Sequence, residues 1–204
     1  MLKLDHIAVA CETLEEGRAH VEAALGQPLE PGGKHTRLGT HNMLMGLEGG
    51  IYFELIAIDP DAPDPGIRRW FDLDDFSGPP CLTNWICQTG DITDALAIAP
   101  PQMGTPMELT RGDLKWLMAA GIDGRLPFRQ GFPAIISWGA SPHPSTRLKP
   151  TGLMLERLVI ANPEAEALRL ALQPLFADAR VVIEQGPVAM RAEFSSPAGR
   201  RVIE

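Results

Sequence analysis

The chain has 204 residues, of which 45% are apolar and 22% charged, as is usual for a globular protein. At ~150 residues per domain this length fits one large domain or two small ones, and such a chain needs no disulfide or metal to fold. Its 26 acidic residues outnumber its 18 basic ones, which gives a net charge of −8. Because the basic residues occur singly or in pairs, a nucleic-acid-binding surface is excluded.

The N-terminal sequence and the cysteines predict a cytoplasmic protein. The first ten residues contain Asp5 and lack a long apolar run, so we expect no signal peptide. No stretch of ~18 uncharged apolar residues predicts a membrane-spanning helix. Cys11, Cys81 and Cys87 are odd in number and form no CxxC motif, which favours a reducing compartment. The absence of a P-loop and of a GxGxxG motif predicts no nucleotide cofactor.

Residues 1–60 form the first predicted segment. A β-rich run covers residues 4–10, and a capping box from Thr13 to Glu16 opens a helix that ends at Gly26. Two apolar runs separated by glycines follow it and predict a hairpin. The expected order is β-α-β-β-β.

Residues 151–204 repeat this order. A strand at 155–161 precedes Asn162-Pro163, which predicts an N-cap followed by proline in the first turn of a helix, and three short strands follow. The first strands of the two segments align with a constant offset of 151, and they differ at His6, which faces Arg157. The repeated order indicates a duplication.

Two further segments lie between these repeats. Residues 61–81 are acidic and proline-rich, and they predict an ordered linker or a lid. Residues 82–150 show a weaker β-α-β-β-β pattern. Since each unit places one helix beside a small sheet, the fold class is α+β.

Strand alternation singles out one histidine and one glutamate. His6 and Glu54 lie on strands whose other face is purely apolar, so both side chains point away from the helix. If that side is concave, the two could form an acid–base pair or bind a divalent metal. The alternative is a histidine whose ring is simply satisfied by a neighbouring carboxylate.

A glycine-rich stretch, GGKHTRLGTHN, adds His35 and His41 as candidate acid–base groups. Its glycines allow the backbone to approach a ligand closely, or they merely form turns. His143 lies between two prolines that fix the backbone, which predicts a structural turn at this position. Five further residues suit an apolar pocket with polar anchors and are predicted to contact the substrate: Asn42, Met43, Met45, Tyr52 and Trp138. The alternative is that they serve the structure alone, as core packing or strand capping.

The order of several short motifs resembles the glyoxalase-like domain family of the vicinal-oxygen-chelate superfamily. This superfamily includes glyoxalases, bleomycin-resistance proteins and extradiol dioxygenases. The motifs are LDHI, GGKH, GTHNML, YFELI, LPF, ISWG and PHPS, and they extend over nearly the whole chain. The resemblance implies repeated βαβββ modules that form a curved, half-barrel mixed sheet with the helices outside.

The resemblance also implies where a metal would be held. The matching positions are His6 and Glu54, with Glu204 at the carboxylate position of the last segment, and the metal would be Zn, Ni, Fe or Mn. Arg157 occupies the remaining position, where it would repel a cation but could hold a substrate carboxylate or phosphate. If the middle segment is the partner instead, Asn84 and Ser137 take these positions.

The function implied is that of an enzyme acting on a small carbonyl- or hydroxyl-bearing substrate, by lyase, isomerase or dioxygenase chemistry. The alternative is a protein of the same fold that binds or sequesters a small molecule without converting it. Modules of this kind often complete their sheets with a second chain, so a homodimer is also expected.

Overall fold

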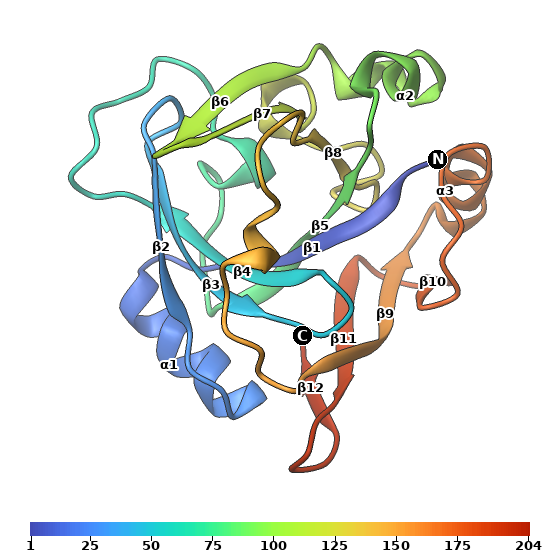
Figure 1. Cartoon of the computed structure of the whole chain (residues 1–204). Helices are drawn as coiled ribbons and strands as arrows, with labels where there is room; N and C mark the ends of the chain where they lie inside the picture. The colour runs from blue at the N-terminus through green and yellow to red at the C-terminus, as the bar shows by residue number, and fades with distance from the viewer.

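The computed structural model describes residues 1–204 and contains three α-helices and twelve strands in three successive β-α-β-β-β units (Figure 1). The first unit comprises β1 (Lys3–Ala10), α1 (Leu14–Leu25), β2 (Glu30–His35), β3 (Thr40–Gly46) and β4 (Tyr52–Ile58). The second comprises β5 (Cys81–Gln88), α2 (Ile92–Ile98), β6 (Met107–Arg111), β7 (Leu114–Ala119) and β8 (Ala134–Ser137). The third comprises β9 (Met154–Asn162), α3 (Ala165–Leu172), β10 (Val181–Gln185), β11 (Ala189–Ser195) and β12 (Arg201–Ile203).

The first two units share one mixed sheet of eight strands, in the order β2-β3-β4-β1-β5-β8-β7-β6. Their junction is the antiparallel pair β1–β5. The third unit forms its own sheet of four strands, in the order β10-β9-β11-β12. The first unit therefore pairs with the second, which decides the pairing that the sequence left open.

The eight-stranded sheet curls until its two ends meet (Figure 1). Arg111 of β6 donates to the side-chain oxygen of Asn42 on β3 at 3.1 Å, and Arg37 donates to the carbonyl of Glu108 on β6 at 3.0 Å. The α+β class and the half-barrel are thus confirmed. Its concave side is the only place where side chains of β1, β4 and β6 can meet.

Local signals account for the helix that covers the convex side of the first unit. The hydroxyl of Thr13 accepts a hydrogen bond from the backbone N–H of Glu16 at 3.2 Å, as the capping box predicts. Gly26 ends α1 in the left-handed conformation, with φ of 70°. Val21 and Leu25 are buried beneath the helix.

The third unit begins its helix later than predicted. Asn162 accepts a hydrogen bond from the N–H of Glu164 at 2.8 Å and donates to the carbonyl of Phe128 at 2.7 Å, and α3 then starts at Ala165. Asn162 therefore forms a turn and ties the third unit to the second, instead of capping the helix directly. None of the three helices is both long and apolar enough to cross a bilayer.

Candidate active site

A bulge in β1 turns two neighbouring side chains toward the same side. The pairing with β5 shifts between Leu4 and His6, and Asp5 lies in the shift. A bulge breaks strand alternation, so Asp5 reaches the ring of its neighbour: its Oδ1 lies 2.6 Å from His6 Nδ1. Asp5 is fully buried and His6 is 3% exposed. The sequence pattern predicted His6 on this side, but not Asp5.

Asp5 accepts three hydrogen bonds, two of them from distant parts of the chain. Besides His6, the indole N–H of Trp138 donates to it at 2.9 Å and His143 Nε2 lies 3.0 Å away. The N–H of Ser145 approaches His143 Nδ1 at 3.3 Å, so Nδ1 accepts and Nε2–H donates to Asp5. Burial raises the pKa of Asp5, but the hydrogen bonds from His143 and His6 outweigh it and hold the pKa well below its usual range.

His6 lies between two carboxylates. Its Nε2 is 3.4 Å from Glu54 Oε2, and its ring stacks on Tyr52 with a centroid distance of 4.3 Å. Burial lowers the pKa of His6, but the hydrogen bonds and charges of Asp5 and Glu54 raise it by more. The pKa of His6 therefore lies above its usual value of 6.5. Burial likewise raises the pKa of Glu54, but His6 brings it down to about 2. The two carboxylates therefore favour the imidazolium form of His6, and Glu54 is held as a carboxylate.

Asn42 fixes Glu54 and His35. Its Oδ1 accepts from the N–H of Gly33 at 2.9 Å and from Arg111 at 3.1 Å, which leaves its Nδ2 to donate to Glu54 Oε1 at 2.5 Å. Gly32 is required here, because a Cβ would lie 2.1 Å from Asn42 Oδ1. The same Nδ2 lies 3.5 Å from His35 Nε2.

His35 is neutral at pH 7. Burial lowers its pKa to about 4. Since its Nε2 faces the Asn42 amide donor, its Nδ1–H donates to the hydroxyl of Thr40 at 3.0 Å. The ring packs edge-on against Trp70, with centroids 4.9 Å apart. His35 thus shapes the site without carrying a charge.

His6, His35, Tyr52, Glu54 and Arg111 line one small cavity with a volume of about 20 Å³. Its other walls are mostly apolar and come largely from the second unit and from the segment after β4: Trp70, Phe71, Trp116, Met118, Ile136 and Trp138. A space of this size holds about one water molecule. Binding of anything larger therefore requires a wall to move.

The wall formed by Trp70 and Phe71 belongs to a short 3-10 helix, Trp70–Asp72, in the acidic segment. We call residues 68–75 the lid segment. Phe71 and Asp72 have positive φ of 60° and 56°, which is unusual for residues other than glycine.

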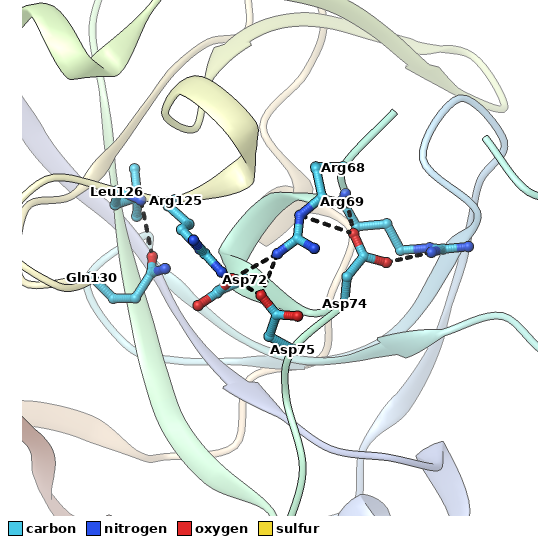
Figure 2. Close-up of polar contacts among 8 residues, drawn as sticks. All are labelled: Arg68, Arg69, Asp72, Asp74, Asp75, Arg125, Leu126 and Gln130. Carbon is cyan, nitrogen blue, oxygen red and sulfur yellow. Dashed lines mark hydrogen bonds and ion pairs between the residues drawn. The ribbon is translucent and has the colours of Figure 1, made fainter. Parts of the chain in front are cut away.

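Ion pairs tie the lid segment to the loop before β8 (Figure 2). Arg125 pairs with Asp72 at 2.9 Å and also with Asp75, and Arg68 pairs with Asp75 from the other side. The backbones approach closely as well, because a Cβ on Gly124 would lie 1.8 Å from the carbonyl oxygen of Arg69.

The donors of this cavity do not fit a metal centre with a full set of protein ligands. His6 and Glu54 are both present, but the second unit lines the cavity with Trp116, Met118, Ile136 and Trp138 besides Arg111, and Asn84 and Ser137 are not among the lining residues. No three His, Cys, Asp or Glu side chains come together in a way that could hold an ion.

Three first-unit residues predicted at the site, His41, Met43 and Met45, lie outside the cavity. His41 and Met43 are on β3 next to Asn42 and face the opposite side, with His41 Nδ1 4.0 Å from Asp59. Met45, on the same side, is fully buried in the core.

The third-unit candidates are also elsewhere. Arg157 is on β9 and pairs with Glu184 at 2.8 Å, with 41% of its side chain exposed. Glu204 follows β12 and is exposed, and its backbone carbonyl accepts from Leu82 at 3.0 Å. Neither residue is brought together with His6 and Glu54, because the third unit has its own sheet.

The structure adds residues that the sequence did not indicate. Asp5 was missed because alternation excluded it, and His143, predicted as a structural turn, also contacts the Asp5 carboxylate. Arg111, Trp70 and Trp116 reach the cavity only because the sheet curls and the lid segment folds over it. The adjacent Asp5-His6 pair was the one available signal, since such a pair orients an imidazole if the strand is irregular.

Comparison with known proteins shows the family to which the chain belongs. The sequence profile of the glyoxalase-like domain family matches residues 4–176. The chain belongs to this family. Through it, the protein is part of the vicinal-oxygen-chelate superfamily, as its motifs suggested.

Solved structures share the fold at low sequence identity. A hypothetical protein from Staphylococcus aureus superimposes with a TM-score of 0.64 at 17% identity, covering 92% of this chain and 88% of that one. Methylmalonyl-CoA epimerase from Mycobacterium tuberculosis gives 0.43 at 18% identity, covering 68% and 88%. The search of curated proteins returned no match. These similarities describe the fold alone.

Proposed function

We propose that this protein is an enzyme of the isomerase or lyase type that moves a proton on a small carbonyl-bearing molecule in the concave cavity. The observation that supports this most is the Asp5–His6–Glu54 arrangement. The His6 imidazole and the Glu54 carboxylate lie 3.4 Å apart at one buried cavity, and a second buried carboxylate orients the imidazole. Paired acid and base groups held in this way are typical of proton-transfer catalysis.

The chemistry follows from the two charges. His6 Nε2–H donates a hydrogen bond to the substrate carbonyl oxygen and then its proton, while the Glu54 carboxylate takes a proton from the adjacent carbon. This forms an enol, and the reverse transfers to the same carbon exchange its hydrogen with solvent. Where that carbon carries a hydroxyl group the intermediate is an enediol; Glu54 then returns a proton to the former carbonyl carbon while His6 takes the proton of the other hydroxyl group, which moves the carbonyl and completes an isomerisation. Asp5 stabilises the imidazolium form, as the raised pKa of His6 indicates.

Substrate binding would make Glu54 a stronger base. Its pKa of about 2 depends on the hydrogen bond and charge of His6. A substrate oxygen that takes over the Nε2–H of His6 removes part of this stabilisation, so the pKa of Glu54 rises toward that of an ordinary carboxyl group. The resting pair is therefore unreactive until a carbonyl group separates its members.

The test is exchange of carbon-bound hydrogen for solvent deuterium, followed by proton NMR on dihydroxyacetone, hydroxyacetone, pyruvate and 2-oxobutanoate. The wild type should accelerate exchange on at least one compound. His6→Gln and Glu54→Gln should each slow it about hundredfold or more. His41→Gln is the matched control, because His41 lies outside the cavity and its loss should leave the rate unchanged.

Two outcomes oppose the proposal. If no compound exchanges faster than in buffer, proton-transfer catalysis on this class is refuted. If a compound changes the tryptophan fluorescence but does not exchange, the protein is a binder. Three of the four tryptophans line the cavity, so fluorescence reports binding directly. The expected homodimer and cytoplasmic location stay predictions, and light scattering after gel filtration tests the former.

A further inference from the structure

Three hydrogen-bond donors at this cavity have no use in the proton-transfer scheme. Trp70 and Trp116 are each only 5% exposed, and their indole N–H groups are buried without an acceptor. Buried N–H groups are almost always paired, and leaving one unpaired costs free energy. Two such donors on the wall of one cavity therefore need an explanation.

The third donor is a guanidinium without a counter-ion. Arg111 lines the cavity and donates only to the neutral amide of Asn42. No carboxylate lies within ion-pair distance of it, whereas Arg68, Arg125, Arg147 and Arg157 all have acidic partners. A half-buried, unpaired arginine beside two free indole N–H groups is a typical receptor for an anionic oxygen group.

The charges at the cavity agree with an anionic guest. Glu54 lies 3.4 Å from His6 and Asp5 lies 2.6 Å from it, and His35 is neutral at pH 7, whereas Arg111 is a lining charge with no partner of opposite sign within ion-pair distance. The cavity is also small, about 20 Å³ in this structure. Because Arg111 and His6 line the same small cavity, an anionic group held by Arg111 and a carbonyl held by His6 would lie close together in the ligand.

We infer that the substrate carries a carboxylate bonded directly to its reacting carbonyl carbon, as in a 2-oxo acid, and that Arg111, Trp70 and Trp116 receive this carboxylate. The inference rests on the proposed function, since the carbonyl oxygen is the group that faces His6. The aromatic walls favour a flat ligand, and a 2-oxo acid is planar across its two carbonyl carbons. A phosphate would bring more charge than one guanidinium balances.

The experiment measures binding of pyruvate, 2-oxobutanoate and benzoylformate by calorimetry at pH 7, each beside its neutral amide and with inorganic phosphate as a further probe. Each amide keeps the size and the reacting carbonyl but lacks the charge. We expect at least one acid to bind about tenfold or more tightly than its amide. Trp70→Phe and Trp116→Phe should weaken the acid severalfold and leave the amide unchanged, and Arg111→Met should abolish the preference.

Trp85→Phe is the matched control, because Trp85 is buried outside the cavity and its N–H already donates to the carbonyl of Gly131 at 2.9 Å. It should lower stability without altering the preference. The inference is overturned if no acid binds, if the amides bind as tightly as the acids, or if phosphate competes equally. If the protein accelerates deuterium exchange on a neutral carbonyl compound but binds the acids no more tightly than their amides, the carboxylate receptor is refuted and the proposed function stays intact. Preferential binding of acids without exchange would refute the proposed function instead.

Discussion

Replacing Asp5 with asparagine tests how the site is held together. Asp5 is fully buried and its two oxygens accept from His6, Trp138 and His143. An asparagine has a single acceptor oxygen and adds two N–H donors, so at least one of the three donors loses its acceptor and meets another donor. Hydrogen bonds to a charged group contribute about 1.5–3 kcal/mol each, so we expect Asp5→Asn to lower the free energy of unfolding by about 2–4 kcal/mol.

The same change acts on catalysis through His6. Without the negative charge behind it, the imidazolium is less stable and the pKa of His6 falls, so less of the protein carries the proton that His6 donates. We expect deuterium exchange to slow by about hundredfold or more. Urea denaturation at pH 7 measures the first effect and proton NMR the second.

Asp113→Asn is the matched control, because Asp113 is 69% exposed and pairs with Arg147 at the surface. Exposed ion pairs contribute about 0–1 kcal/mol, so this variant should be almost as stable as the wild type. The reasoning would be refuted if Asp5→Asn were equally harmless and left the exchange rate unchanged.

Three further predictions concern acid stability and the lid segment. Because the pKa of Glu54 is lowered from 4.5 to about 2, its carboxylate stabilises the fold above pH 4.5. The free energy of unfolding should fall by about 3 kcal/mol as the pH falls toward 2. In urea titrations Glu54→Gln should flatten this decline, and an equally steep decline in the variant would contradict the prediction. Gly124→Ala should push the backbone of Arg69 away and make tryptophan fluorescence easier to quench with acrylamide, whereas Gly49→Ala, also at positive φ but with open space around it, should not. Arg125→Met should hardly change the melting temperature, because each exposed ion pair contributes less than about 1 kcal/mol. It should nevertheless increase acrylamide quenching of the tryptophan fluorescence at low salt. An increase that persists at 1 M salt would argue against an ionic tether.

Strand periodicity predicted the part of the site that depends on regular strands. His6 and Glu54 lie on neighbouring parallel strands, β1 and β4, and alternation placed both on the concave side. The same rule separates Asn42 from His41, since adjacent residues of one strand point to opposite faces. It could not predict Asp5, because the bulge that turns this side chain inward leaves no mark in the residue types.

The other half of the site depends on long-range structure. Arg111 is separated from Asn42 by 69 residues and reaches it only after the eight-stranded sheet has curled. Trp70 comes from a segment whose acidic composition predicted a linker or a lid but gave no position for either. The family resemblance placed Glu204 and Arg157 at the site because it could not tell which two units pair.

The most direct test of the account is the protonation state of His6, measured by NMR of its ring nitrogens during a pH titration. We expect a pKa above 6.5 for His6, because the two carboxylates outweigh burial. This protonation stabilises the fold below pH 6.5, and its contribution is lost as the pH rises through the folded pKa. Both nitrogens should therefore carry protons at pH 6.5. A His6 that is mostly neutral at that pH would contradict an imidazolium held ready between Asp5 and Glu54.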